Sequence, residues 1–143
     1  MPSIHQPSGA GLWTYRSYSN NPDSNTPCKE LELGQADLHI GISKDKEITG
    51  RIDGEGWGLE LAGIQKDGDP ITLLIRGSGK VGGHQWIYDY LCYAIPEMKD
   101  GVNQVRALVG AVTRIIPHPN IDGSGPPHPA GVVGSFFAVF RSK

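Results

Sequence analysis

Short apolar runs, separated by clusters of glycine, proline and polar residues, follow one another along the whole chain. Within most runs apolar and polar residues alternate with a period of two, and the i, i+3, i+4, i+7 spacing of an amphipathic helix is almost nowhere sustained. Twenty glycines and eleven prolines punctuate the runs. The pattern therefore predicts eight β-strands, at residues 11–18, 36–43, 47–53, 57–65, 71–79, 84–95, 107–116 and 131–141.

The connections between these runs indicate how the strands are arranged. Four of them are short and polar, which is typical of hairpins between antiparallel neighbours; they lie at 44–46, 54–56, 66–70 and 80–83. Three are longer, at 19–35, 96–106 and 117–130, and we expect a short helical turn at 96–105 that begins with Pro96. Eight antiparallel strands in chain order favour closure into an up-and-down barrel, with an open β-sandwich as the alternative.

The length of the chain sets the domain organisation. Its 143 residues, 38% of them hydrophobic, are enough for one domain with one core. We therefore predict a single all-β barrel domain over residues 1–143, with a flexible N-terminal tail at 1–10 and a surface loop rich in proline and glycine at 117–130. An eight-stranded barrel is wide enough to hold side chains and one small ligand.

The sixth predicted strand, HQWIYDYLCY at its start, carries most of the candidate chemistry. Alternation places Trp86, Tyr88 and Tyr90 on one face, with Asp89 on the other. In one interpretation the aromatic face forms the wall of a pocket, which Trp57 extends, and Asp89 makes an ion pair on the exterior. In the other interpretation Asp89 faces the ligand and the aromatic residues pack elsewhere.

A carboxylate between the apolar residues of this strand needs a cation or acquires a raised pKa. Arg114, on the next predicted strand, and Arg16, on the first, are the candidate partners of Asp89. The phase of the first strand also decides the role of Arg16. If Trp13 and Tyr15 point inward, Arg16 points outward; in the opposite phase Arg16 enters the barrel and can bind a carboxylate or enolate oxygen.

Five histidines are spread over the chain without the spacing of a metal site, such as HxH or HExxH. We therefore expect no bound metal and no cofactor. His118 lies beside the long loop at 117–130, where it is a candidate acid or base. The two cysteines, Cys28 and Cys92, are expected to be free thiols, with a single bridge between them as the alternative.

Charge and composition exclude several classes of partner. Thirteen basic and fifteen acidic side chains give a net charge of −2, and no basic stripe is present, which argues against nucleic acid. No apolar run is long enough to span a membrane, and no export signal is visible. We therefore expect a soluble cytoplasmic protein with no membrane partner.

The sequence Gly11-Leu12-Trp13 on the first predicted strand and Arg141 on the last resemble the calycin superfamily of lipocalin-like and avidin-like barrels. The resemblance implies a barrel whose closed end holds Trp13 in a cation–π contact with Arg141. It also implies the phase in which Trp13 points inward. It covers the strand plan of the whole chain and about three residues by motif, and it names no ligand.

These features support a small-molecule-binding barrel. We expect a cofactor-free cyclase, isomerase or lyase acting on a small, largely apolar or aromatic substrate; the alternatives are a non-catalytic carrier with the same cavity and an interaction module with a fully packed barrel. The candidate catalytic residues are Tyr88, Asp89, Tyr90, Arg16 and His118, and the candidate ligand-binding residues are Tyr15, Trp57, Trp86 and Arg114.

The last predicted strand is apolar on both faces, with Val133 and Phe137 on one and Phe136 and Ala138 on the other. One of these faces must lie outside a barrel, and a second copy would cover it. We therefore predict a homodimer or larger homo-oligomer. Gel filtration is expected to give at least twice the monomer mass of 15.4 kDa, and elution at the monomer mass would contradict the prediction.

Overall fold

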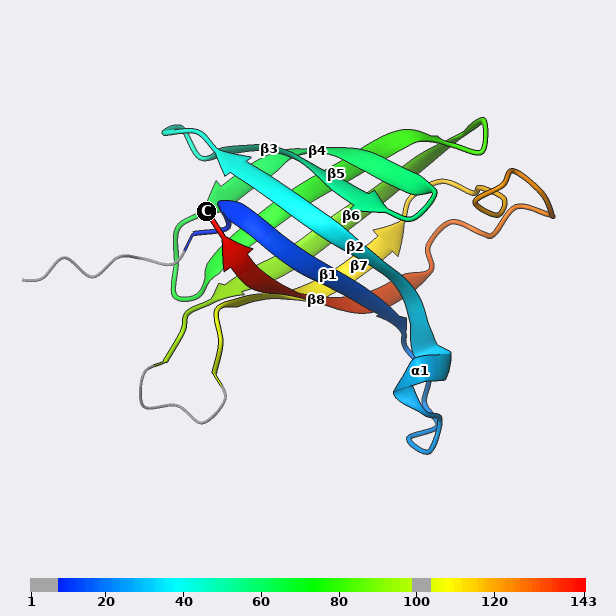
Figure 1. The fold of residues 1–143 in the computed structure, drawn as a ribbon, viewed down its shortest axis with the longest axis horizontal. Helices are drawn as coiled ribbons and strands as arrows, with labels where there is room; N and C mark the ends of the chain where they lie inside the picture. Colours follow the sequence, from blue (N-terminus) through cyan, green and yellow to red (C-terminus); the bar gives the residue numbers. More distant parts are fainter. Residues whose placement is uncertain (1–7, 99–103) are drawn as a thin grey trace, which may run out of the picture.

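A computed structural model describes residues 8–98 and 104–143 and places eight β-strands in one closed barrel (Figure 1). The strands are β1 (Gly11–Ser19), β2 (Glu32–Ile42), β3 (Glu47–Gly54), β4 (Trp57–Lys66), β5 (Ile71–Val81), β6 (His84–Ile95), β7 (Ala107–Arg114) and β8 (Val133–Ser142). One short helix, α1 (Cys28–Leu31), precedes β2. The predicted all-β up-and-down barrel is therefore confirmed.

Each strand pairs antiparallel with its neighbours in the sequence, and β1 closes the barrel by pairing with β8. The four predicted hairpin connections join β2 to β3, β3 to β4, β4 to β5 and β5 to β6. Closure leaves no free edge on the sheet, which an open β-sandwich would have. The sandwich alternative is therefore wrong.

Two segments differ from the prediction. β2 begins at Glu32, before the predicted 36, and α1 lies in a stretch that was expected to be a loop. The helix spans only 28–31, too short for its apolar spacing to show in the sequence. The predicted helical turn at 96–105 includes residues 99–103, which lie outside the described part of the chain. No helix in the described residues is long and apolar enough to cross a membrane.

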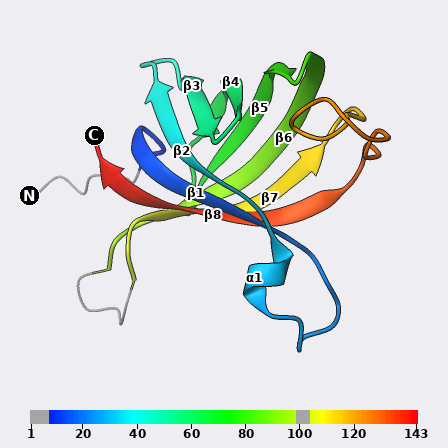
Figure 2. The same ribbon diagram turned by 45° about the vertical axis from the view of Figure 1, so that its right-hand side comes forward.

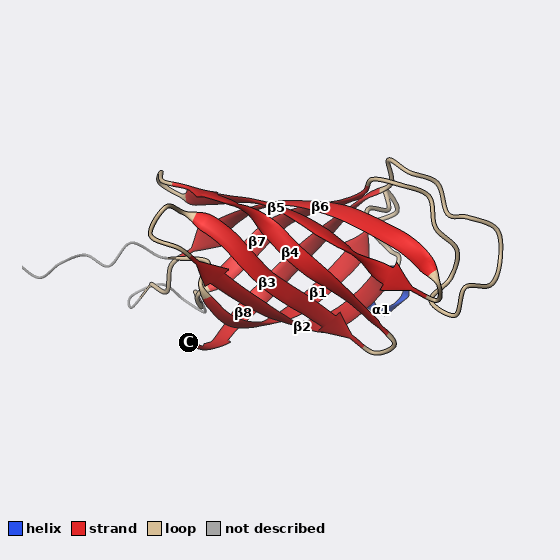
Figure 3. Cartoon of the chain, turned by 90° about the horizontal axis from the view of Figure 1, so that it is seen from above, coloured by secondary structure: helices blue, strands red, loops and turns tan. Residues whose placement is uncertain are grey.

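The eight strands enclose one interior (Figure 2). Alternate residues of the strands fill it, and those between them face outward. The interior is packed with aliphatic and aromatic side chains, among which Trp13, Leu73, Leu108 and Ala138 are completely buried. Cys92 is buried in the same core, whereas Cys28 is exposed, and both are free thiols. Buried residues from all eight strands form one core. The C-terminus lies at one end of the barrel (Figure 3).

Strand direction divides the connections between the two ends of the barrel. The segments 20–31, 55–56, 82–83 and 115–132 lie at one end, and these include α1 and the predicted proline-rich loop. The other end holds the segments 43–46, 67–70, 96–98 and 104–106 together with residues 8–10. We call the first the open end and the second the closed end.

Trp13 seals the closed end together with Phe140 and Arg106. The Trp13 and Phe140 rings meet edge to face at 5.2 Å between centroids. The Arg106 guanidinium lies 3.9 Å from the centroid of Phe140 and 5.3 Å from that of Trp13, and donates 2.8 Å to the carbonyl of Ser8. The Trp13 indole N–H donates to the carbonyl of Gly9 at 3.0 Å.

The predicted pairing of Trp13 with Arg141 is therefore wrong, and Arg106 takes that place. Trp13 pairs in register with Phe140, so alternation turns Phe140 toward the barrel and Arg141 away from it. Arg141 lies outside and donates to the carboxylate of Asp37 at 3.1 Å.

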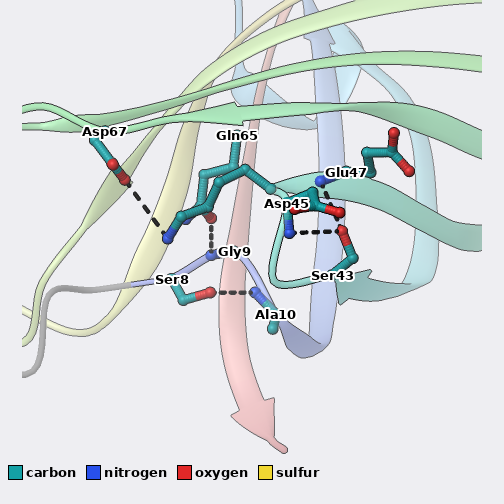
Figure 4. Close-up of polar contacts among 9 residues, drawn as sticks. Ser8, Gly9, Ala10, Ser43, Asp45, Glu47, Gln65 and Asp67 are labelled. Carbon is teal, nitrogen blue, oxygen red and sulfur yellow. Dashed lines mark hydrogen bonds and ion pairs between the residues drawn. The ribbon is translucent and has the colours of Figure 1, made fainter.

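Residues 8–10 lie across the closed end, where side chains of the barrel form hydrogen bonds with their backbone groups. The side-chain oxygen of the buried Gln65 accepts a hydrogen bond from the Gly9 N–H at 3.0 Å (Figure 4). Nearby, Lys46 and Asp67 form an exposed ion pair at 3.6 Å, and Ser43 caps the turn between β2 and β3. The start of the described chain is thus part of the barrel, and the predicted tail over 1–10 is too long by the residues from Ser8 onward.

Replacing Arg106 tests the closed end. Arg106→Ala removes a charged hydrogen bond and two cation–π contacts, so the free energy of unfolding is expected to fall by about 2 kcal/mol. The matched control, Arg141→Ala, removes an exposed ion pair and is expected to change stability by less than about 1 kcal/mol. Urea denaturation measures both, and equal losses would contradict the assignment.

Candidate functional site

A pocket of about 580 Å³ opens at the open end of the barrel. Strands supply its floor and walls, and the loop at 115–132 and the start of β2 supply its rim. The lining residues that the argument uses are Tyr15, Trp57, Trp86, Tyr88, Tyr90, Arg114 and His118. Seven of the nine residues predicted for the site therefore lie together, and Asp89 and Arg16 do not.

β6 presents its aromatic face to this pocket. Trp86, Tyr88 and Tyr90 line it, and Asp89 lies on the opposite face of the strand. Of the two interpretations of this strand, the one with an aromatic pocket wall and an exterior Asp89 is confirmed.

Asp89 makes a bidentate ion pair with Arg76 of β5, at 2.7 and 3.0 Å, in an exposed position on the barrel wall. The predicted partners were Arg114 and Arg16, and both predictions are wrong. In the observed register Asp89 lies opposite Thr113 on one side and Arg76 on the other. Arg114 lies opposite Tyr88, one residue away, and so turns to the inner face.

The first strand has the phase that the calycin resemblance implies. Trp13, Tyr15 and Ser17 are buried inside the barrel, and Arg16 is exposed on its exterior. Arg16 therefore cannot bind a ligand oxygen in this pocket.

Tyr15, Tyr90 and Phe136 form an aromatic floor. The Tyr15 and Tyr90 rings each lie within 5.5 Å of the Phe136 ring, between centroids. Burial raises the pKa of Tyr15 to about 12 and that of Tyr90 well above 10.0. Both residues stay neutral phenols at physiological pH, so they bind a ligand by packing and hydrogen bonding rather than by exchanging a proton with it.

Tyr88, Arg114 and His118 form a hydrogen-bonded cluster on the pocket wall. The Tyr88 oxygen lies 2.5 Å from Nε2 of His118, and Nε of Arg114 donates to the same oxygen at 3.0 Å. Arg114 also donates to the carbonyl of Pro129 at 3.0 Å, which ties the end of β7 to the loop. One phenol oxygen is thus held between a cation and an imidazole.

The protonation of His118 follows from its partners. Its Nδ1 lies 2.7 Å from the carbonyl of Pro119, which only accepts, so this nitrogen carries the proton. Nε2 is left as the acceptor for the hydroxyl of Tyr88. Burial lowers the pKa of His118 below its usual 6.5, and the charge of Arg114 acts in the same direction. A neutral imidazole therefore faces Tyr88 at neutral pH.

The loop at 117–130 holds His118 rigidly although it has no regular structure. His118 and His128 exchange two backbone hydrogen bonds, at 2.8 and 3.3 Å, and so form an isolated β-bridge. The ring of His118 stacks on Trp86 at 3.9 Å between centroids, and only 4% of the residue is exposed. Nε2 of His128 donates to Oδ1 of Asn120 at 2.8 Å.

His128 and Asn120 line the pocket but were not predicted as site residues. Their only signal in the sequence is proximity to His118 in the proline-rich loop. Pairing of His118 with His128 cannot be inferred from the proline and glycine content that marks a loop.

The pocket wall beside this cluster is aromatic, since Trp86 stacks on His118 and lies next to Trp57. Trp57 and Trp86 lie 6.3 Å apart, with their rings inclined by 29°. Trp86 is 7% exposed, and its indole N–H is buried without a hydrogen-bond partner among the described residues. Gly34 lines the pocket beside Trp57. A Cβ at this position would lie 3.5 Å from the Trp57 ring, which is an ordinary van der Waals contact, so a side chain could be placed there.

In residues 8–98 and 104–143 no three histidine, cysteine, aspartate or glutamate side chains lie together so as to hold a metal ion. The polar groups of the pocket include one guanidinium, two imidazoles and phenol hydroxyls, with a single carboxylate, Asp122, on the loop. This set can bind an oxygen atom and move a proton.

Comparison of the chain with family models, curated proteins and solved structures gives no match. The fold and the arrangement of these side chains are therefore what bears on function.

The lowered pKa of His118 predicts a pH-dependent stability. The unfolded chain takes up a proton at about pH 6.5 whereas the folded chain does not, so the free energy of unfolding should decline as the pH falls through 6.5. Urea denaturation at a series of pH values measures this decline. We expect His118→Gln to reduce the slope and the exposed, exterior His39→Gln to retain it; an unchanged slope in His118→Gln would contradict the assignment.

Proposed function

We propose that this protein is a cofactor-free enzyme that binds a small, largely apolar or aromatic molecule in the barrel and moves a proton on it. Isomerisation, cyclisation and elimination all contain such a step. The observation that carries the proposal is the Tyr88 hydroxyl, held 2.5 Å from His118 and 3.0 Å from Arg114 on the wall of a 580 Å³ pocket. A binding pocket alone needs no such cluster.

The cluster can act as a base and then as an acid. The Tyr88 oxygen donates its proton to His118 and accepts one hydrogen bond from Arg114, so one lone pair remains for a substrate proton. As that proton arrives, the phenol proton passes to Nε2 of His118, so Tyr88 stays neutral and His118 becomes an imidazolium. The electron pair of the broken C–H bond stays on the substrate as an enolate, whose negative charge the nearby Arg114 guanidinium stabilises. Reversal of these transfers returns a proton to another carbon or to a leaving group.

The remaining predicted residues have supporting roles in this proposal. Trp57, Trp86, Tyr15 and Tyr90 hold the substrate by packing, and Tyr15 and Tyr90 can donate hydrogen bonds to it. Asp89 and Arg16 have no part, because both lie on the exterior.

The closed barrel, the inward Trp13 on β1 and the sealed end support membership of a calycin-like group of barrels. The free thiols support a reducing compartment such as the cytoplasm. Exposed Ile64 on β4 and Leu91 on β6 are aligned across the partly exposed Leu74 on β5, and Phe137 on β8 is also exposed; these apolar side chains support the proposed homo-oligomer.

A carrier of a hydrophobic ligand is the second candidate. Its supporting observation is the aromatic floor of Tyr15, Tyr90 and Phe136, which holds no charged group. In a carrier, Arg114 and His118 would only hold the loop over the ligand, through the contacts with Pro129 and Pro119.

Hydrogen–deuterium exchange separates the two candidates. The probe is β-tetralone, a flat aromatic ketone with an acidic C–H, incubated in D₂O and followed by proton NMR. The enzyme is expected to accelerate exchange next to the carbonyl, and Tyr88→Phe and His118→Gln are expected to lower the rate about 100-fold.

Asp89→Asn and Arg16→Lys are the matched controls on the exterior and are expected to leave the exchange rate unchanged. The rate should also decline at low pH as His118 becomes protonated, with a midpoint below 6.5. Saturable binding of β-tetralone without accelerated exchange would favour the carrier, and equal rates in wild type and Tyr88→Phe would refute the proposed mechanism.

A further inference from the structure

Arg114 lies half-buried in the pocket wall and is bonded only to neutral groups. Its Nε donates to the Tyr88 hydroxyl and its Nη1 to the carbonyl of Pro129, both at 3.0 Å. Its Nη2 makes no hydrogen bond to any residue in the described part of the chain. Two of the three guanidinium nitrogens are thus fixed, and the third is left for a ligand.

Three arginines of the barrel have counter-ions, whereas Arg114 has none among the described residues. Arg51, Arg76 and Arg141 each form an ion pair with an exterior carboxylate. No ion pair within 8–98 or 104–143 involves Arg114. A cation that is partly removed from water gains most from an anion at short range, and a guanidinium binds the two oxygens of a delocalised anion especially well.

The charges around Arg114 leave this preference intact. Within the described lining Asp122 is the one carboxylate; it lies on the exposed loop, and one of its oxygens accepts from both the N–H and the hydroxyl of Ser124. His118 has a lowered pKa and is neutral at pH 7. The Arg114 guanidinium is therefore the charge that an entering ligand meets beside Tyr88.

The rest of the lining selects the shape of the ligand. Trp57 and Trp86 form an aromatic wall, and Tyr15 and Tyr90, packed on Phe136 beneath them, form an aromatic floor, so the bulk of the ligand is apolar and meets flat rings. A molecule that satisfies both requirements is a conjugated or aromatic acid.

We propose that the substrate is a flat, conjugated anion, a carboxylate or an acidic enol, whose charged oxygens bind Nη2 of Arg114 while its apolar part lies against Trp57 and Trp86. This inference rests on the proposed function, since it names the substrate class of the same pocket. The anion would be placed next to Tyr88, where a proton is taken from or returned to an adjacent carbon.

The test compares two probes of nearly equal shape, 1-naphthoate and neutral 1-naphthamide, by isothermal titration calorimetry with the full-length protein at pH 7. We expect the naphthoate to bind at least about tenfold more tightly, with a preference that weakens at high salt. Arg114→Met should abolish the preference. Arg16→Met removes an equal charge from the exterior and should retain it.

The position of the bound probe is tested separately with Gly34→Leu. This change places a side chain in the pocket beside Trp57, where its Cβ fits at 3.5 Å, and should weaken both probes. Circular dichroism verifies that Gly34→Leu and Arg114→Met remain folded. If either variant unfolds, Arg114→Gln, which also removes the charge, serves instead of Arg114→Met, and Gly34→Val serves instead of Gly34→Leu.

Equal affinity for the two probes, or a preference for the naphthoate that survives in Arg114→Met, would overturn the proposal. No binding of the naphthoate, or naphthoate binding unaffected by Gly34→Leu, would overturn it as well. Repeating the titration with 2-hydroxy-1,4-naphthoquinone, an acidic enol, shows whether the pocket binds an enol or a carboxylate more tightly. Either anion held by Arg114 supports the proposal.

The inference and the proposed function can fail independently. Charge preference is measured without turnover, and Tyr88→Phe is expected to keep it while losing proton exchange. Loss of exchange with an intact preference would refute the enzyme and leave an anion carrier, whereas exchange without a preference would refute only the anionic substrate.

Discussion

Closure of β1 onto β8 is the constraint on which the rest of the structure depends. Once the sheet is a cylinder, each strand has one inner and one outer face, and a shift of one residue in any register would exchange the two. The pairing of Tyr88 with Arg114 is the clearest case. It puts a phenol and a guanidinium on the inner face, and it leaves Asp89 to the exterior with Arg76.

The fold was largely predictable because period-two alternation and glycine-rich turns are local signals. They gave the eight strands in order, with β6 at its observed bounds and others displaced by a few residues at their ends. The sequence did not reveal α1, since a helix spanning 28–31 is stabilised by its surroundings rather than by its own pattern. Most residues of the site were also predictable, because seven of the nine candidate residues line the pocket.

The partners of those residues were not predictable, because they depend on register and on loop conformation. The sequence paired Asp89 with Arg114, which lie one position out of register. It assigned Arg141 to Trp13, although the residue that covers the indole, Arg106, comes from the end of a long connection. His118 was identified from its place beside a loop, yet its contact with Tyr88 requires the backbone pairing with His128.

The closed end of the barrel contributes stabilising contacts, and the open end holds the candidate site. The closed end holds Trp13, Phe140 and Arg106 in contacts that exclude water, and Gln65 fastens the chain across it. Stability is concentrated there and in the apolar middle of the barrel, which allows the open end to retain groups that do not stabilise the fold. A neutral buried histidine and an arginine without a counter-ion among the described residues are such groups. Hydrogen bonds to Tyr88 and Pro119 compensate for the burial of His118, and the half-buried position of Arg114 at the pocket reduces the cost of a charge that has no counter-ion until a ligand binds.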